Sequence, residues 1–260
     1  MVHHLPLRSI PVPFPIVGVD QDLSSVVATS LEDSGLSLRR GDVICVASKI
    51  VSTCEGRIVK LRDVPVSSDA KRLARKWKMD QYLAAVVLGE ADEVLGGVPG
   101  FLLTIKNGTL TPNAGVDIKN SPPGTATLWP LDPDKSAQEL RSRLERKYTT
   151  RVCVEIVDSH VTPLRLGTVG LAIGVSGFLP VLDSRKTPDL FGRTIKVTQT
   201  NLADDLAAVA HMLMGEGAER VGAVLIRGAR VALNNSGRSK FARLNRNKCL
   251  IGSRLGKARS

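Results

Sequence analysis

The sequence contains a run rich in β-branched residues, Arg151-Val152-Cys153-Val154-Glu155-Ile156-Val157, which is followed at once by Asp158-Ser159. β-Branched side chains pack well on a pleated surface, so this run predicts a buried strand that ends at Asp158. Two other short apolar runs, Val43–Ala47 and Val221–Ile226, also have the length of buried strands. The first of them ends in the polar pair Ser48-Lys49, and the second is closed by Arg227-Gly228.

Helical spacing of apolar residues appears between these runs. The spacing predicts helices over Asp22–Leu36 and over Asn201–Met214, with Gly215 as the stop of the second. The segment Ser67–Leu95 is rich in Ala, Leu and Lys, and we expect it to hold one or two helices. Ser136–Glu139 has the pattern of a capping box, which predicts that a helix begins at Ser136.

The order of strands and helices is irregular along the chain. Phe101–Ile105 predicts a strand that leads into a turn at Asn107-Gly108. The glycine-rich stretch Gly167–Gly177 does not match GxGxxG and has no helical pattern directly behind it, so a dinucleotide-binding site is weakly supported. Neighbouring strands mixed with long crossovers favour an α+β fold over a regular doubly wound sheet.

Composition is that of an ordinary globular protein, with 43% hydrophobic and 23% charged residues among 260. No apolar stretch approaches the roughly 18 residues that a membrane span needs, and Met1–Ile10 lacks the apolar region of a secretion signal. The four cysteines are scattered without a CxxC pair (Cys45, Cys54, Cys153, Cys249). We therefore expect reduced thiols, no zinc site and a cytoplasmic location.

The net charge of +11 is concentrated at the end of the chain. Residues 234–260 carry eight basic residues and no acidic ones, which leaves +3 for residues 1–233. We predict that 234–260 is a basic tail, either solvated or lying over an anionic ligand. A tail that binds RNA or DNA is the alternative, but Phe241 is its single aromatic residue, and base stacking needs more.

Standard catalytic motifs are absent, which restricts the chemistry. The sequence has no GxxxxGK[ST], no GxSxG and no HExxH. Of the four histidines, His3 and His4 are adjacent near the start and His211 falls inside a predicted helix. A mechanism based on histidine thus has little support beyond His160.

Acidic residues in turns are the remaining candidates. Asp117 lies in a turn rich in Asn and Gly, Asp158 follows the buried run, and Glu216 follows the predicted helix stop. Carboxylate oxygens suit Mg²⁺ or Mn²⁺, and a bound metal that bridges phosphate oxygens is a common device of phosphoryl transfer. Because Asp, Asn and Gly favour turns in any protein, the alternative is that these residues have no role beyond the turn.

A resemblance favours the functional interpretation. From about Ile10 to Val231, the chain resembles the coenzyme F420-0:L-glutamate ligase family (F420 γ-glutamyl ligases). The resemblance is carried by motifs in one order: Pro15-Ile16, Ser48–Ser52, Glu55–Arg57, Asn113–Asp117 with Asn120, Leu131–Ala137, Asp158-Ser159, Arg165-x-Gly167, Ala172–Gly177, Asp189–Arg193, Ala203–Asp205, Met214–Gly217 and Arg227-Gly228.

The resemblance implies a GTP-dependent ligase that forms an acyl phosphate on the deazaflavin precursor F420-0 and transfers the acyl group to the amine of L-glutamate. It also implies a mixed-sheet fold in which 1–233 forms two intertwined subdomains, a homodimer, two Mg²⁺ or Mn²⁺ sites and K⁺. The implied metal ligands are Asp117, Asp158, Ser159 and Glu216, of which the three acids would be catalytic. The implied nucleotide-binding residues are Pro15, Ile16, Val17, Gly18, Ser48, Lys49, Thr53, Asn120, Met214, Gly215, Gly217 and Val221.

The sequence departs from the family pattern at two phosphate-contacting positions. Thr53 stands where the family usually has Lys, and Val161-Thr162 stand where it usually has Gly-Arg. Each lost cationic hydrogen bond would cost on the order of 1.5–3 kcal/mol of binding, unless Lys49, Arg165 or the tail replaces it. A paralogue with another acyl substrate or nucleotide, and a non-catalytic nucleic-acid-binding protein, are the alternatives to a working ligase.

Overall fold

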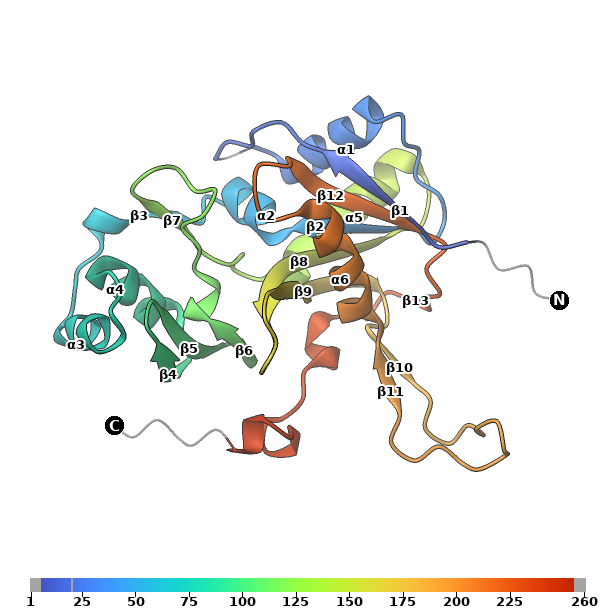
Figure 1. Cartoon of the computed structure of the whole chain (residues 1–260). Coiled ribbons are helices and arrows are strands. Elements are labelled where there is room, and N and C mark those ends of the chain that lie inside the picture. Colours follow the sequence, from blue (N-terminus) through green and yellow to red (C-terminus); the bar gives the residue numbers. More distant parts are fainter. Residues whose placement is uncertain (1–5, 20, 255–260) are drawn as a thin grey trace.

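The computed structural model describes residues 6–19 and 21–254. Its largest element is a six-stranded sheet in the order β1-β12-β2-β8-β9-β13 (Figure 1). The strands are β1 (Arg8–Pro13), β2 (Val43–Ala47), β8 (Cys153–Val161), β9 (Thr168–Phe178), β12 (Val221–Arg227) and β13 (Leu233–Asn234). β2 and β8 pair in parallel and the other pairs are antiparallel, so the sheet is mixed and the predicted α+β class is confirmed.

Helices cover both faces of this sheet. α1 (Leu23–Asp33) and α5 (Pro133–Tyr148) pack on one face, where Val154 and Ile156 of β8 belong to the core. α6 (Leu202–Met214) packs on the other face, against Cys153 and Val157. Strands that are buried on both faces read as continuous apolar runs, which is why the three central strands were predictable from the sequence.

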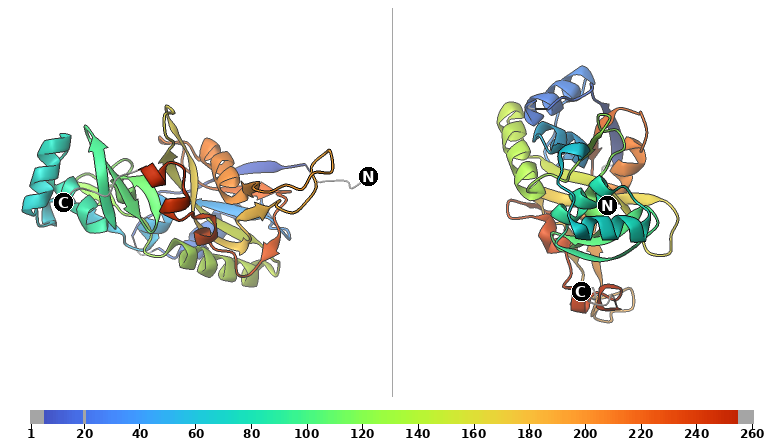
Figure 2. Two further views of the ribbon diagram at one scale, coloured as in Figure 1. Left: turned by 90° about the horizontal axis from the view of Figure 1, so that it is seen from below. Right: turned by 90° about the vertical axis from the view of Figure 1, so that its left-hand side faces the viewer.

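A smaller sheet lies at one end of the elongated molecule and has a core of its own (Figure 2). It consists of β4 (Glu93–Val98), β5 (Phe101–Lys106) and β6 (Thr109–Pro112), next to α3 (Ser68–Trp77) and α4 (Gln81–Glu90). The predicted turn at Asn107-Gly108 is confirmed, with positive φ at both residues. The predicted helical segment Ser67–Leu95 holds two helices, but its end belongs to β4.

Short elements complete the chain. α2 (Ser48–Cys54) follows β2 directly, and β3 (Ile58–Lys60) pairs with β7 (Thr125–Thr127). β10 (Val181–Asp183) and β11 (Gln199–Asn201) form the base of an arm that projects from the body (Figure 1). The 3₁₀ turns are η1 (Leu61–Asp63), η2 (Asn113–Gly115), η3 (Ser239–Ala242), η4 (Arg246–Lys248) and η5 (Gly252–Arg254).

Two local predictions were wrong. α5 begins at Pro133 rather than at Ser136, because the carboxylate of Asp132 accepts from the amide of Lys135 and caps the helix. Ser136 lies inside the first turns, where its hydroxyl contacts the Asp132 carbonyl and Glu55. The predicted strand does not end at Asp158 either, because β8 continues to Val161 in a hairpin with β9.

The glycine-rich stretch is a strand whose glycines permit close helix packing. A Cβ at Gly170 would lie 2.0 Å from the carbonyl oxygen of Ala207 in α6, and one at Gly174 would lie 2.3 Å from that of Pro133 in α5. Real Cβ atoms do not approach backbone so closely, so any side chain at either position would push a helix off the sheet.

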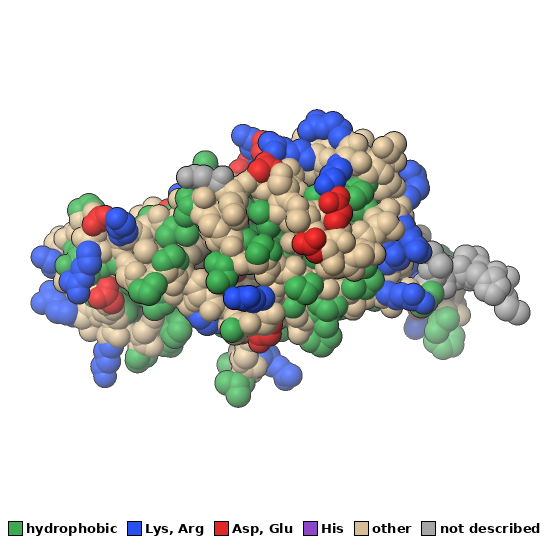
Figure 3. Space-filling model, turned by 90° about the horizontal axis from the view of Figure 1, so that it is seen from above, with side chains coloured by type: hydrophobic (Ala, Val, Ile, Leu, Met, Phe, Trp, Pro, Cys, Tyr) green, Lys and Arg blue, Asp and Glu red, His purple; other side chains and the backbone are tan. Residues whose placement is uncertain are grey.

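The basic tail extends along the body within its described part, 234–254. It leaves β13 and reaches the smaller sheet, where Arg246 pairs with Glu93. On the face seen in Figure 3, Lys and Arg side chains are spread along the molecule and interspersed with acidic ones, rather than gathered into one stripe. None of the described helices is long and apolar enough to span a membrane, and all four cysteines are free thiols.

Candidate active site

One pocket of about 730 Å³ lies where five segments of the chain meet. These segments are the loop after β1, α2, the loop 117–122 after η2, the interior of β8, and the connection from α6 to β12. Ile58 of β3 and Thr127 of β7 complete the lining. The structure brings every site residue named from the sequence to this pocket: Pro15, Ile16, Val17, Gly18, Ser48, Lys49, Thr53, Asp117, Asn120, Asp158, Ser159, Met214, Gly215, Glu216, Gly217 and Val221.

Asp117 is placed by a strained turn. Asn113, Ala114 and Gly115 all have positive φ, and the Asn113 side chain fixes the turn by accepting from the amide of Leu102. The backbone of Asp117 then bridges to Thr127. The carboxylate accepts from the ammonium of Lys49 at 2.7 Å and from the amide of Lys119 at 2.8 Å.

Asp158 lies within β8, just after the register against β9 shifts between Ile156 and Val157. Such a bulge re-aims the side chains that follow it. The carboxylate of Asp158 accepts from the hydroxyl of Ser48 at 2.7 Å and from the indole nitrogen of Trp129. Burial raises the pKa of Asp158 above its usual value, against the opposing effect of these two donors. Ser159 lines the pocket beside it.

Glu216 follows Gly215, whose positive φ ends α6. Its carboxylate accepts from the ammonium of Lys119 and from the hydroxyl of Thr168 at 3.0 Å, and it lies 2.8 Å from Nε2 of His211. Burial alone would raise the pKa of Glu216, but these donors outweigh it and lower the pKa to about 2. Glu216 is therefore ionised throughout the neutral range.

The donor set of the pocket suits a hard divalent cation. Its acidic members are carboxylates, and Ser159 adds a hydroxyl, so the atoms offered are oxygens. Among the described residues, no three Asp, Glu, His or Cys side chains converge to hold a metal by themselves. Mg²⁺ is usually held by one or two carboxylates together with substrate phosphates, so this arrangement fits an ion that arrives with a phosphorylated ligand.

Comparison with known proteins identifies the family. The model of the F420-0:Gamma-glutamyl ligase family matches residues 11–228. The chain belongs to this family. It is 39% identical to the coenzyme F420:L-glutamate ligase of Methanopyrus kandleri over 87% of this chain and 89% of that protein. It is 36% identical to the enzyme of the same name from Methanothermobacter thermautotrophicus, over 82% and 85% of the two chains.

The cations around the pocket of this F420-0:γ-glutamyl ligase family member differ in part from those expected. Lys49 lines the pocket, and so do Lys119 and Arg220, which sequence reasoning missed. Neither Arg165 nor any tail residue of 234–254 is among the described lining residues, so the structure does not bring those two expected replacements to the pocket. Thr53 lines the pocket, but its hydroxyl donates to the carbonyl of Lys49.

The histidines also differ from expectation. His211 contacts Glu216 and lines the pocket, whereas His160 is not among the described lining residues. Burial lowers the pKa of His160, and its Nδ1 has no hydrogen-bond partner among the described residues. Helical position gave no signal for His211, because its contact depends on the turn at Gly215 that folds Glu216 back onto the helix.

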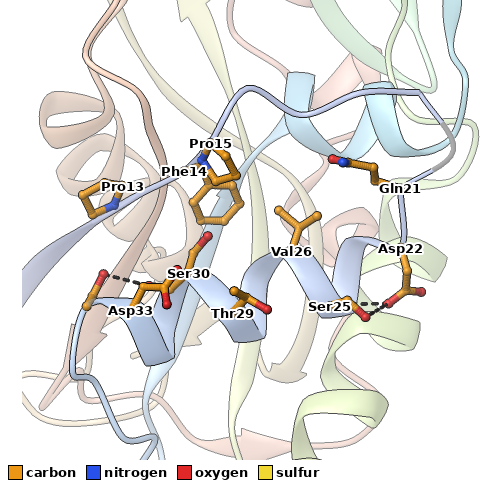
Figure 4. Close-up of a pocket in the computed structure, with 11 residues that line it drawn as sticks. Pro13, Phe14, Pro15, Gln21, Asp22, Ser25, Val26, Thr29, Ser30 and Asp33 are labelled. Carbon is orange, nitrogen blue, oxygen red and sulfur yellow. Dashed lines mark hydrogen bonds between the residues drawn. The ribbon is translucent and has the colours of Figure 1, made fainter.

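A second pocket, of about 650 Å³, lies along α1 and shares Phe14 and Pro15 with the first (Figure 4). Its described lining contains the acids Asp22 and Asp33 and no Lys, Arg or His. Asp22 is paired with Arg143, so the lining offers a triphosphate no cation of its own and leaves Asp33 to repel it. The pocket of about 730 Å³ contains all the site residues named from the sequence, so it is the candidate active site of this family member.

Proposed function

We propose that this protein is a GTP-dependent ligase that joins L-glutamate, through an amide, to the deazaflavin precursor coenzyme F420-0. The observation that carries the proposal is the convergence of sixteen residues named from the sequence, on five separate segments, at one pocket. Family membership and relatives named coenzyme F420:L-glutamate ligase support the class of reaction.

A carboxylate is a poor acylating agent because its leaving group would be oxide. Transfer of the γ-phosphate of GTP to the F420-0 carboxylate gives an acyl phosphate and GDP. Attack of the glutamate amine on the acyl carbon then forms the amide and releases phosphate. Two Mg²⁺ or Mn²⁺ ions would neutralise the triphosphate during this transfer. Asp117, Asp158, Ser159 and Glu216 would hold them, with K⁺ as a further ion that the family resemblance implies.

The protein's own residues would position the nucleotide. Gly18, Gly215 and Gly217 have no Cβ and let backbone approach the phosphates, while Lys49 and Lys119 add positive charge. Asn120 donates to the carbonyl of Gly217 at 2.8 Å and so joins two of the loops around the pocket. The apolar wall for the base and sugar consists of Pro15, Ile16, Val17, Met214 and Val221.

We also propose that the protein is a homodimer in which the arm formed by β10, β11 and the loop between them packs against the partner subunit. The arm carries large apolar side chains that its own body leaves open: Leu190 is 99% exposed, Phe191 81% and Val197 84%. Contiguous exposed apolar side chains typically mark an interaction site.

A divergent paralogue is the second candidate, and the residues at 53 and 161–162 favour it. They remove two phosphate-contacting cations of the family pattern, which would weaken the binding of the nucleotide's phosphates. A nucleic-acid-binding protein is less favoured, because the described part of the tail runs along the body and pairs with Glu93.

The deciding experiment is incubation of the purified chain with F420-0, GTP, Mn²⁺ and L-glutamate, followed by mass spectrometry. We expect the mass of F420-0 to increase by one glutamyl unit with the wild type, and we expect no such product with Asp117→Asn. Product formed with another nucleotide in place of GTP would favour the paralogue. No product with any nucleotide or metal would refute the ligase.

A further inference from the structure

The three carboxylates of the pocket already have a donor on each of their oxygen atoms. Asp158 accepts from Ser48 and Trp129, which are neutral groups. The other two carboxylates each accept from an ammonium group, Lys49 on Asp117 and Lys119 on Glu216. A divalent cation that binds Asp117 or Glu216 would therefore lie next to an ammonium group that already pairs with that carboxylate.

A divalent ion would repel the charged ammonium of Lys119 more strongly than it would repel a neutral donor. Its amide donates to Asp117 at 2.8 Å, its carbonyl accepts from Lys49, and its ammonium donates to Glu216. One residue thus contacts two candidate metal ligands through different atoms. Its side chain is 52% exposed, so the flexible stem has room to leave Glu216.

A divalent ion on Glu216 would repel the ammonium by like charge. Asp117, Asp158 and Glu216 are the acidic residues in the described lining, and the ions would occupy all three. Glu219 lies close enough to raise the pKa of Lys119, but it is outside that lining and already accepts from the amide of Gly217. A bound phosphate group is then the anion that faces the displaced ammonium inside the pocket.

We propose that Lys119 competes with the divalent cation for Glu216 and, once displaced, binds a phosphate group of the nucleotide. The inference rests on the proposed function, because it needs both ions and nucleotide in this pocket. Lys119 would then supply a phosphate-binding cation, in place of the Lys and Arg that the family usually has where this chain has Thr53 and Thr162. It also makes metal and nucleotide binding cooperative, since the nucleotide gives the displaced ammonium a new partner, and such coupling is reciprocal.

The test is a titration of Mn²⁺ binding by electron paramagnetic resonance on the full chain, with and without GTP. Without GTP, Lys119→Ala should bind Mn²⁺ about two- to fivefold more tightly than the wild type, the range expected for removal of a half-exposed ion pair. Addition of GTP should then raise the Mn²⁺ affinity of this variant by a smaller factor than in the wild type. Lys119→Arg should restore the larger factor.

Lys135→Ala is the matched control. Lys135 is an exposed lysine of α5 that does not line the pocket, so this variant loses the same charge and should bind Mn²⁺ as the wild type does. Unchanged or weaker Mn²⁺ binding by Lys119→Ala without GTP would overturn the competition. If Asp117→Asn also binds Mn²⁺ like the wild type, the pocket is not the metal site and the proposed function fails with it.

Discussion

Glu155 allows a quantitative test of how the main sheet tolerates a buried acid. Its side chain is fully buried between β8 and α6, and neither carboxylate oxygen has a hydrogen-bond partner among the described residues. Burial, and to a lesser extent the negative charge of Asp204, raise the pKa of Glu155 well above 4.5. The group is therefore protonated in the folded protein at a pH where the unfolded chain has released the proton.

The direction of the pH effect follows from this difference. Because the folded-state pKa is raised, folding takes up a proton above pH 4.5, and stability falls as pH rises from there to the folded-state pKa. The slope is about 1.4 kcal/mol for each pH unit. Glu155→Gln has no such proton to bind. Its free energy of unfolding, relative to that of the wild type, should therefore rise by about 1.4 kcal/mol for each pH unit.

The assay is urea unfolding of both proteins at several pH values between about 5.5 and 7, because other titrating groups cancel in the difference. We expect Glu155→Gln to be the more stable protein at neutral pH. A difference that stays constant over this range, or a variant that becomes relatively less stable as pH rises, would rule out the burial of an unpaired neutral acid.

Three further perturbations have definite expected outcomes. Gly115→Ala should destabilise the protein by roughly 1–3 kcal/mol in urea unfolding, because Gly115 has a φ of +73° and a Cβ there would lie 2.2 Å from the Trp129 indole; an unchanged midpoint would contradict this. Arg227→Ala should cost about 3–5 kcal/mol, because it leaves the buried carboxylate of Asp42 without its cation; a loss under about 1 kcal/mol would argue against it. Phe191→Asp should shift the protein from dimer to monomer in analytical ultracentrifugation. A variant that sediments like the wild type would contradict the proposal that the arm holds the dimer together.

The main sheet was predictable because its strands are buried on both faces. Val43–Ala47 and Val221–Ile226 stand out as apolar runs whatever their partners. The end of β8 was not predictable, because the residues just beyond Asp158 are polar and are held in the strand only by pairing with β9. The start of α5 was missed because both Asp132 and Ser136 are residue types that can cap the N-terminus of a helix. In the folded chain the N-cap is Asp132.

The pocket was predictable through ordered motifs rather than through local chemistry. Asp117, Asp158 and Glu216 look like ordinary turn residues when each is considered alone. Lys119 and His211 were missed because their contacts with Glu216 join segments that are distant in sequence or depend on the bend at Gly215. Long-range pairing of this kind leaves no periodic trace in the chain.

The proposed ligase requires Asp117, Asp158 and Glu216 to hold divalent cations together with the nucleotide. Counting the Mn²⁺ ions bound to each subunit in the presence of GTP decides whether they do. We expect two ions for the wild type, and fewer or much more weakly bound ions for Asp117→Asn and Glu216→Gln. If both variants bind Mn²⁺ in the same number and with the same affinity as the wild type, these carboxylates do not hold the metal.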